Sequence, residues 1–146
     1  MTGVQTCALP ISGVFTGHIG APSVWVAPDG KRRLSAAPDD NAVRILDVET
    51  GKELWRINAP NPVCVAFSPD GKRIVTGGYE DMKMRVWDVA TGKELCKYEG
   101  HRDGVTCVTY FPNGKRIVST SYDGTAHIWR APRTDEILPE KESKSP

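Results

Sequence analysis

Three stretches of the 146-residue chain share one pattern: APDGKRRL at 27–34, SPDGKRIV at 68–75 and FPNGKRIV at 111–118. Their glycines, Gly30, Gly71 and Gly114, are separated by 41 and 43 residues. A second match keeps the same register, with DVETGKELWRI at 47–57 and DVATGKELCKY at 88–98. A period of 41–43 residues is the length of a repeat unit made of four strands, so this repeat decides the fold.

The residues around each repeat predict strands and tight turns. Pro-Asp-Gly and Pro-Asn-Gly form turns because proline presets φ and glycine accepts the positive φ of a hairpin. Short strand-like runs flank the turns, such as PVCVAF at 62–67 and KRIVTG at 72–77. No segment has a helical period of useful length. The sequence therefore predicts an all-β chain in which each unit has four antiparallel strands.

Composition excludes several classes of function. The 19 basic and 18 acidic side chains leave a net charge of +1, so we predict no nucleic-acid partner. The sequence contains no run of 18 or more apolar residues, so we predict no membrane span. The cysteines, at 7, 64, 96 and 107, form no CxxC pair. We therefore predict no metal and no cofactor, and a reducing, cytoplasmic location.

The two ends of the chain differ from its repeats. Residues 1–11, MTGVQTCALPI, contain no charged side chain and lack the positive n-region of a signal peptide. They resemble the translation of a sequencing adapter, so we interpret 1–11 as non-native; the alternative is a loose native N-terminus. Residues 132–146 have the composition of a polar tail that does not pack.

The repeat motifs resemble the WD-repeat β-propeller family. The third repeat carries Gly100-His101, Phe111-Pro112-Asn113-Gly114, Ser119 to Thr125 and Ile128-Trp129; the second carries Phe67 to Gly71 and Val86-Trp87-Asp88; the first carries Gly17-His18. The resemblance implies a partial propeller at 12–131, with repeats at about 17–57, 58–99 and 100–131. It predicts three four-stranded antiparallel blades. The outer strand of the last blade is either missing or formed by Asp135-Glu136-Ile137-Leu138.

In this family a His, a Ser or Thr, an Asp and a Trp form a hydrogen-bonded chain across one blade. The resemblance assigns these roles in the third repeat to His101, Ser119, Asp123 and Trp129. A buried Trp needs an acceptor for its N–H, which a serine can supply. The other repeats have partial sets: His18, Ser35 and Asp40 in the first, and Thr76, Asp81 and Trp87 in the second. We expect hydrophobic packing to hold those two blades.

His101, Ser119 and Asp123 also have the residue types of a nucleophilic triad. No nucleophile elbow surrounds Ser119, and the repeat requires structural residues at these positions. His127 occupies the strand position of Arg44 and Arg85, which indicates a strand residue and not a metal ligand. We therefore predict no catalytic residue and no enzyme activity.

Propellers of this family mostly act as rigid platforms for other proteins. The resemblance thus implies a protein–protein interaction scaffold with protein or peptide partners. The candidate contact face consists of loop-side residues: Asp39, Asn61, Val63, Tyr79, Glu80, Arg102, Thr106 and Tyr122. Tyr79 and Tyr122 are the best anchors, because a rigid aromatic side chain provides much contact area for little entropy.

Three blades would leave two sheet faces bare. We therefore interpret the chain as the C-terminal part of a larger ring, whose remaining blades would be further partners. The alternative function follows from that interpretation. The chain would then be the regulatory or targeting propeller of a larger enzyme, such as a bacterial protein kinase, with its catalytic part upstream.

Overall fold

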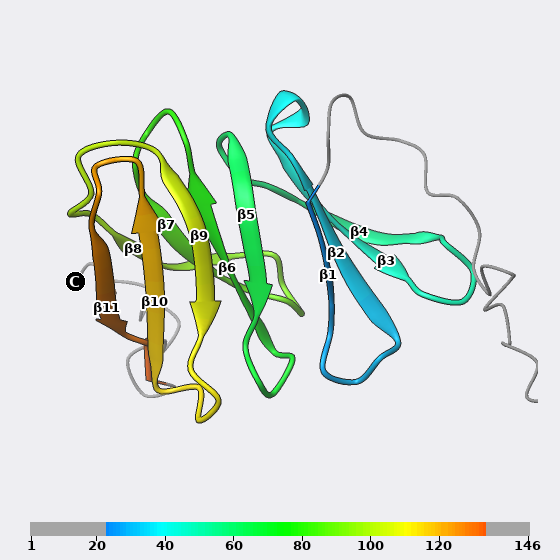
Figure 1. Ribbon diagram of the computed structural model, residues 1–146. Coiled ribbons are helices and arrows are strands. Elements are labelled where there is room, and N and C mark those ends of the chain that lie inside the picture. Colours follow the sequence, from blue (N-terminus) through cyan, green and yellow to red (C-terminus); the bar gives the residue numbers. More distant parts are fainter. Residues whose placement is uncertain (1–22, 134–146) are drawn as a thin grey trace, which may run out of the picture.

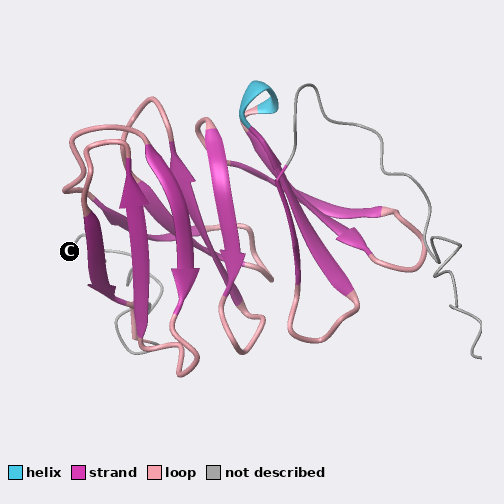
Figure 2. Ribbon diagram, viewed as in Figure 1, coloured by secondary structure: helices cyan, strands magenta, loops and turns pink. Residues whose placement is uncertain are grey.

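The computed structural model describes residues 23–133 as three antiparallel sheets (Figures 1 and 2). Blade 1 contains β1 (Ser23–Val26), β2 (Arg32–Ala37), β3 (Ala42–Asp47) and β4 (Glu53–Asn58). Blade 2 contains β5 (Pro62–Phe67), β6 (Arg73–Gly78), β7 (Met84–Asp88) and β8 (Glu94–Tyr98). Blade 3 contains β9 (Val105–Tyr110), β10 (Arg116–Ser121) and β11 (Ala126–Arg130). One 3-10 turn, η1 (Pro38–Asp40), joins β2 to β3.

The prediction of an all-β chain built from antiparallel blades is confirmed. The first two sheets have four strands, and within the described residues the third has three, in the order β11-β10-β9. The proposed fourth strand at 135–138 lies outside the described residues, as do 1–11 and His18. Among residues 23–133, no helix is long and apolar enough to cross a membrane.

Each Pro-Asp-Gly or Pro-Asn-Gly stretch forms the first hairpin turn of its blade. In blade 2, Gly71 has φ 69°, and its N–H donates to the carbonyl oxygen of Ser68 at 2.8 Å. A residue just after the third strand then bonds back to this turn. The N–H groups of Val48, Val89 and Ala131 donate at 2.9 Å to the carbonyl oxygens of Lys31, Lys72 and Lys115. The same backbone hydrogen bond thus joins the end of the third strand to the first hairpin turn in all three blades.

The blades pack face to face through two apolar layers. Strand β5 lies against both β1 and β9, so the first strands of the three blades are neighbours (Figure 1). The layer between blades 1 and 2 includes Leu34, Ile45, Val65, Ile74 and Trp87. The layer between blades 2 and 3 includes Val75, Val86, Val105, Val108 and Ile117. Blade 2 is therefore covered on both faces.

Blade 3 has one exposed face. Ile45, Val86 and Ile128 occupy the same position in the third strands of blades 1, 2 and 3. The first two are 0% exposed and Ile128 is 62% exposed. The cysteines of the first strands show the same contrast, since Cys64 is buried and Cys107 is exposed. Within residues 23–133, no fourth sheet covers this face.

Candidate interaction face and its supporting network

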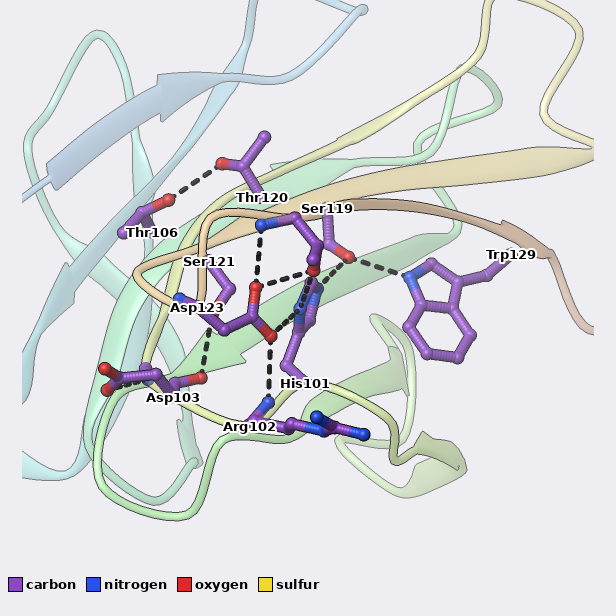
Figure 3. A network of polar contacts seen from close by, with 11 residues as sticks. His101, Arg102, Asp103, Thr106, Ser119, Thr120, Ser121, Asp123 and Trp129 are labelled. Carbon is purple, nitrogen blue, oxygen red and sulfur yellow. Dashed lines mark hydrogen bonds and ion pairs between the residues drawn. The ribbon is translucent and has the colours of Figure 1, made fainter.

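A continuous polar chain crosses blade 3 (Figure 3). The Oγ of Ser119 on β10 lies 2.7 Å from His101 Nε2 and accepts the indole N–H of Trp129 at 2.8 Å. His101 Nδ1 lies 3.0 Å from Asp123 Oδ2. That oxygen also accepts the backbone N–H of Arg102 at 2.9 Å. The structure thus brings together the four residues that the WD-repeat resemblance singled out.

The Asp123 carboxylate is held by several hydrogen bonds in the turn between β10 and β11. The Thr125 hydroxyl and backbone N–H donate to Asp123 Oδ1 at 2.6 Å and 2.8 Å. The Thr125 hydroxyl and the Arg102 N–H are the main causes that hold the pKa of Asp123 well below its usual value. An ionised carboxylate is the stronger acceptor, so it fixes the orientation of His101.

The Ser119 hydroxyl is not accessible to a substrate. Ser119 is 1% exposed, and its Oγ already contacts His101 and Trp129. The ring of His127 stacks on Trp129, with centroids 5.2 Å apart and planes at 17°. A nucleophile must reach the atom that it attacks, and this oxygen is enclosed by its own partners. Among residues 23–133, no group of three His, Cys, Asp or Glu side chains is arranged to hold a metal ion.

Blade 2 forms an equivalent set of polar contacts with different residues. Trp87 Nε1 donates to Thr76 Oγ1 at 3.0 Å, as Trp129 does to Ser119. Arg85, which is 7% exposed, then takes the place of the histidine as the partner of the turn aspartate. Its guanidinium lies 2.5 Å from Asp81 Oδ2 and 3.3 Å from Glu94 Oε2.

Blade 1 repeats the arginine arrangement. Arg44 lies 3.1 Å from Asp40 Oδ2 and 3.3 Å from Glu53 Oε2. The expectation that hydrophobic packing holds these blades is therefore incomplete, because each also has a charged bridge from the third strand to the turn and the outer strand. A signal was available in the sequence: each of the two arginines precedes a glutamate by nine residues.

The loops above the network form a connected face, at the upper end of the blades in Figure 1. The Asn61 N–H donates to Asn41 Oδ1 at 2.7 Å, and the Tyr79 N–H donates to the Asn61 carbonyl at 3.2 Å. The Tyr79 ring lies so close to Gly104 that a Cβ there would be 2.4 Å from Cδ2 of the ring. The Tyr122 N–H donates to the Gly104 carbonyl at 3.0 Å. Loops of all three blades are thus joined, and we call this surface the loop face.

The two tyrosines of the loop face contact each other. Their ring centroids are 5.8 Å apart with planes at 86°, and Tyr79 is 47% and Tyr122 67% exposed. Edge-to-face contact is a preferred geometry of aromatic pairs. The pair is therefore positioned before any partner arrives.

The other residues of the candidate face differ in their exposure to solvent. Asp39, Glu80 and Arg102 are exposed on turns, whereas Asn61 and Val63 are half-buried. Thr106 is exposed on β9, and its Oγ1 lies 2.8 Å from Thr120 Oγ1. The structure thus brings Tyr79 and Tyr122 together and spreads the remaining side chains over three blades.

Stacked antiparallel sheets whose first strands lie side by side define a class of fold, the β-propeller. Two segments of the sequence, 51–88 and 92–130, match the family model WD40 (WD domain, G-beta repeat). The chain belongs to this family of WD40 repeats. Each matched segment contains the outer strand of one blade and the three strands that follow in the next. The sequence matches none of the curated proteins with which it was compared.

Solved structures support the same assignment. The "Structure of U3-55K" and the "Crystal structure of RRP9 WD40 repeats" are each similar to this chain, with a TM-score of 0.74 and 27% sequence identity. The similarity covers 81% of this chain and 38% of each of those chains. The prediction of a partial WD-repeat propeller is confirmed, and the chain spans well under half the length of the solved proteins that it resembles.

Proposed function

We propose that this chain is a non-catalytic interaction module whose loop face binds a peptide segment of another protein. The observation that carries the proposal is the exposed pair of Tyr79 and Tyr122. Tyrosine supplies a large amphipathic contact with few rotatable bonds. Because Gly104 and the ring contact hold the pair in place, binding loses little additional side-chain entropy.

Family membership supports the same class of function, since WD40 repeats build rigid surfaces that carry variable loops. The enclosed Ser119 supports the absence of catalysis by the His–Ser–Asp set. The exposed face around Ile128 is a suitable packing surface for further propeller blades. No observation favours the alternative of a propeller attached to a bacterial protein kinase.

Selection from a random peptide library, followed by affinity measurement, tests the proposal. We expect selected peptides to bind the protein and to lose about tenfold or more in affinity on Tyr122→Ala or Tyr79→Ala, as for an aromatic hot spot. Leu54→Ala is the matched control, because Leu54 is 44% exposed and lies on the outer strand of blade 1. Peptides that bind both tyrosine variants as tightly as the unchanged protein would refute binding at the loop face.

A further inference from the structure

A basic groove lies at the opposite end of the blades from the loop face, beside the first hairpin turns of blades 2 and 3 (lower end in Figure 1). The groove has a volume of about 920 Å³. Its charged lining residues are Asp70, Arg73, Lys115, Arg116, Arg130 and Arg133. Five cations and one carboxylate therefore face a single concave surface.

The charge of the groove arises from two departures within the repeat. Asn113 stands in blade 3 where blade 2 has Asp70, and Arg130 stands where blade 2 has Asp88. The turn itself is unchanged: Asn113 Oδ1 accepts the Lys115 N–H at 3.0 Å, just as Asp70 Oδ1 accepts the equivalent N–H in blade 2 at 3.0 Å. Blade 3 thus lacks two carboxylates that blade 2 has, and Asn113 still supports the first hairpin turn as Asp70 does in blade 2.

Two of the cations are available to a ligand. Lys115 and Arg116 are exposed, and neither forms an ion pair within residues 23–133. Arg73 donates to the carbonyl oxygen of Pro132, which ties the segment after β11 to blade 2 across the groove. The wall of the groove is therefore held in place while its cationic rim faces the solvent.

The basic character does not extend to the next groove along the same end. The groove between the turns of blades 1 and 2 measures about 630 Å³. Its charged lining residues are Arg32, Asp70, Lys72, Arg73 and Asp88, a mixture of both signs. A single strand of nucleic acid requires a positive track along its backbone, whereas a compact anionic group requires only one such site.

We propose that the basic groove binds a short phosphorylated peptide segment. Arginine side chains recognise phosphate through paired N–H donors, and clusters of arginine are a recurrent means of binding phosphorylated motifs. Pro69 and Pro132 add apolar surface to the groove for the neighbouring peptide side chains. This site is separate from the loop face, so the chain would hold two partners at opposite ends.

The net charge of the sequence concealed this surface. Exposed carboxylates at the loop end, including Asp39, Glu80 and Asp103, offset the cations of the opposite end. The average over the whole chain is only +1. A local positive field therefore exists although the total charge does not predict it.

Fluorescence anisotropy with a short labelled peptide that carries two phosphoserines tests the proposal. We expect binding in the micromolar range, and a loss of about tenfold or more with Lys115→Glu. Lys31→Glu is the matched control, because Lys31 occupies the same turn position in blade 1 and undergoes the same charge change. Asn113→Asp should also weaken binding while it preserves the fold, since aspartate already forms this turn in blade 2.

Several outcomes would overturn the proposal. One is the absence of phosphopeptide binding, and another is an equal loss with Lys115→Glu and Lys31→Glu. Equal binding of the unphosphorylated peptide would exclude phosphate recognition, and tighter binding of a labelled RNA oligonucleotide would assign the groove to nucleic acid. Thermal unfolding of each variant confirms that the fold is intact. Tyr122→Ala should leave phosphopeptide binding unchanged, which separates this test from that of the loop face.

Discussion

Blades 1 and 2 differ from blade 3 in the residue that contacts the aspartate of the turn before the third strand. In blade 2, Arg85 contacts both Asp81 and Glu94. In blade 3, His101 from the preceding loop contacts Asp123, and the equivalent strand position, His127, stacks on Trp129 instead. The difference teaches that the repeat requires a partner for the turn aspartate, and that the element that supplies this partner can vary.

The same blades differ in what covers them. Ile45 and Val86 are enclosed by the next blade, and Ile128 in the same position is exposed. Sequence period therefore determines which face of a strand a side chain occupies, whereas burial depends on whether a neighbour is present. Each of the following predictions tests one side of this comparison.

The largest effect is expected from matched isoleucines. Ile45→Ala should lower the free energy of unfolding by about 2–5 kcal/mol, because it opens a cavity between two blades. Ile128→Ala should change that free energy by less than about 0.5 kcal/mol, as surface substitutions usually do. Urea unfolding of the two variants measures the contrast. Equal destabilisation would show that the far face of blade 3 is covered in solution.

The networks can be compared by removing one hydroxyl from each. Ser119→Ala should destabilise the protein by about 1–3 kcal/mol, because it removes the partner of both Trp129 Nε1 and His101 Nε2. Thr76→Val removes the bond to Trp87 alone, so we expect a loss near the lower end of that range. Chemical unfolding gives both values. A larger loss in blade 2 than in blade 3 would contradict the comparison.

The aspartate of blade 3 predicts a specific acid sensitivity. Hydrogen bonds from Thr125 and Arg102 lower the pKa of Asp123 in the folded state below its ordinary value of 3.8. The stabilisation is therefore complete above that value and disappears as the pH falls through the lower folded pKa. The gap in unfolding free energy between the unchanged protein and Asp123→Asn should be constant above about pH 5 and should shrink toward about pH 2. A gap of constant size throughout would refute the assignment.

The smallest effect is expected in the turn after the aspartate. Met82 has φ 58° at the position where blade 3 has Gly124 with φ 81°. A left-handed conformation strains a residue with a side chain, so Met82→Gly should stabilise the protein by about 0.5–1 kcal/mol. Asn41→Gly should instead lower the stability, because asparagine tolerates its φ of 48° in the equivalent turn and its Oδ1 accepts the Asn61 N–H, a bond that glycine removes. A thermal melt of each variant measures the shift.

Much of the fold could be predicted because its cause is local. The 41-residue spacing of Gly30 and Gly71 located the first hairpins, and the DVATGKEL motif at 88–95 located the outer strand β8. Turn residues act through their own φ and ψ, so a single sequence reveals them.

The rest depends on contacts between strands. The role of Arg85 was missed, because its nine-residue separation from Glu94 becomes informative only once the two strands are paired, and its contact with Asp81 depends on a second strand connection. Tyr79 and Tyr122 were each singled out as anchors, but their mutual contact requires two blades to be placed side by side. The basic groove was missed because net charge averages over both ends of the blades.

The backbone bonds from Val48, Val89 and Ala131 to the first hairpin of each blade have a consequence for folding kinetics. Each bond closes a chain segment of only 17 residues or fewer between its partners. Short loops close at small entropic cost, and low contact order favours rapid folding. We therefore expect each blade to assemble its first three strands as one cooperative unit. Docking of the blades through their apolar layers would then be the slower step.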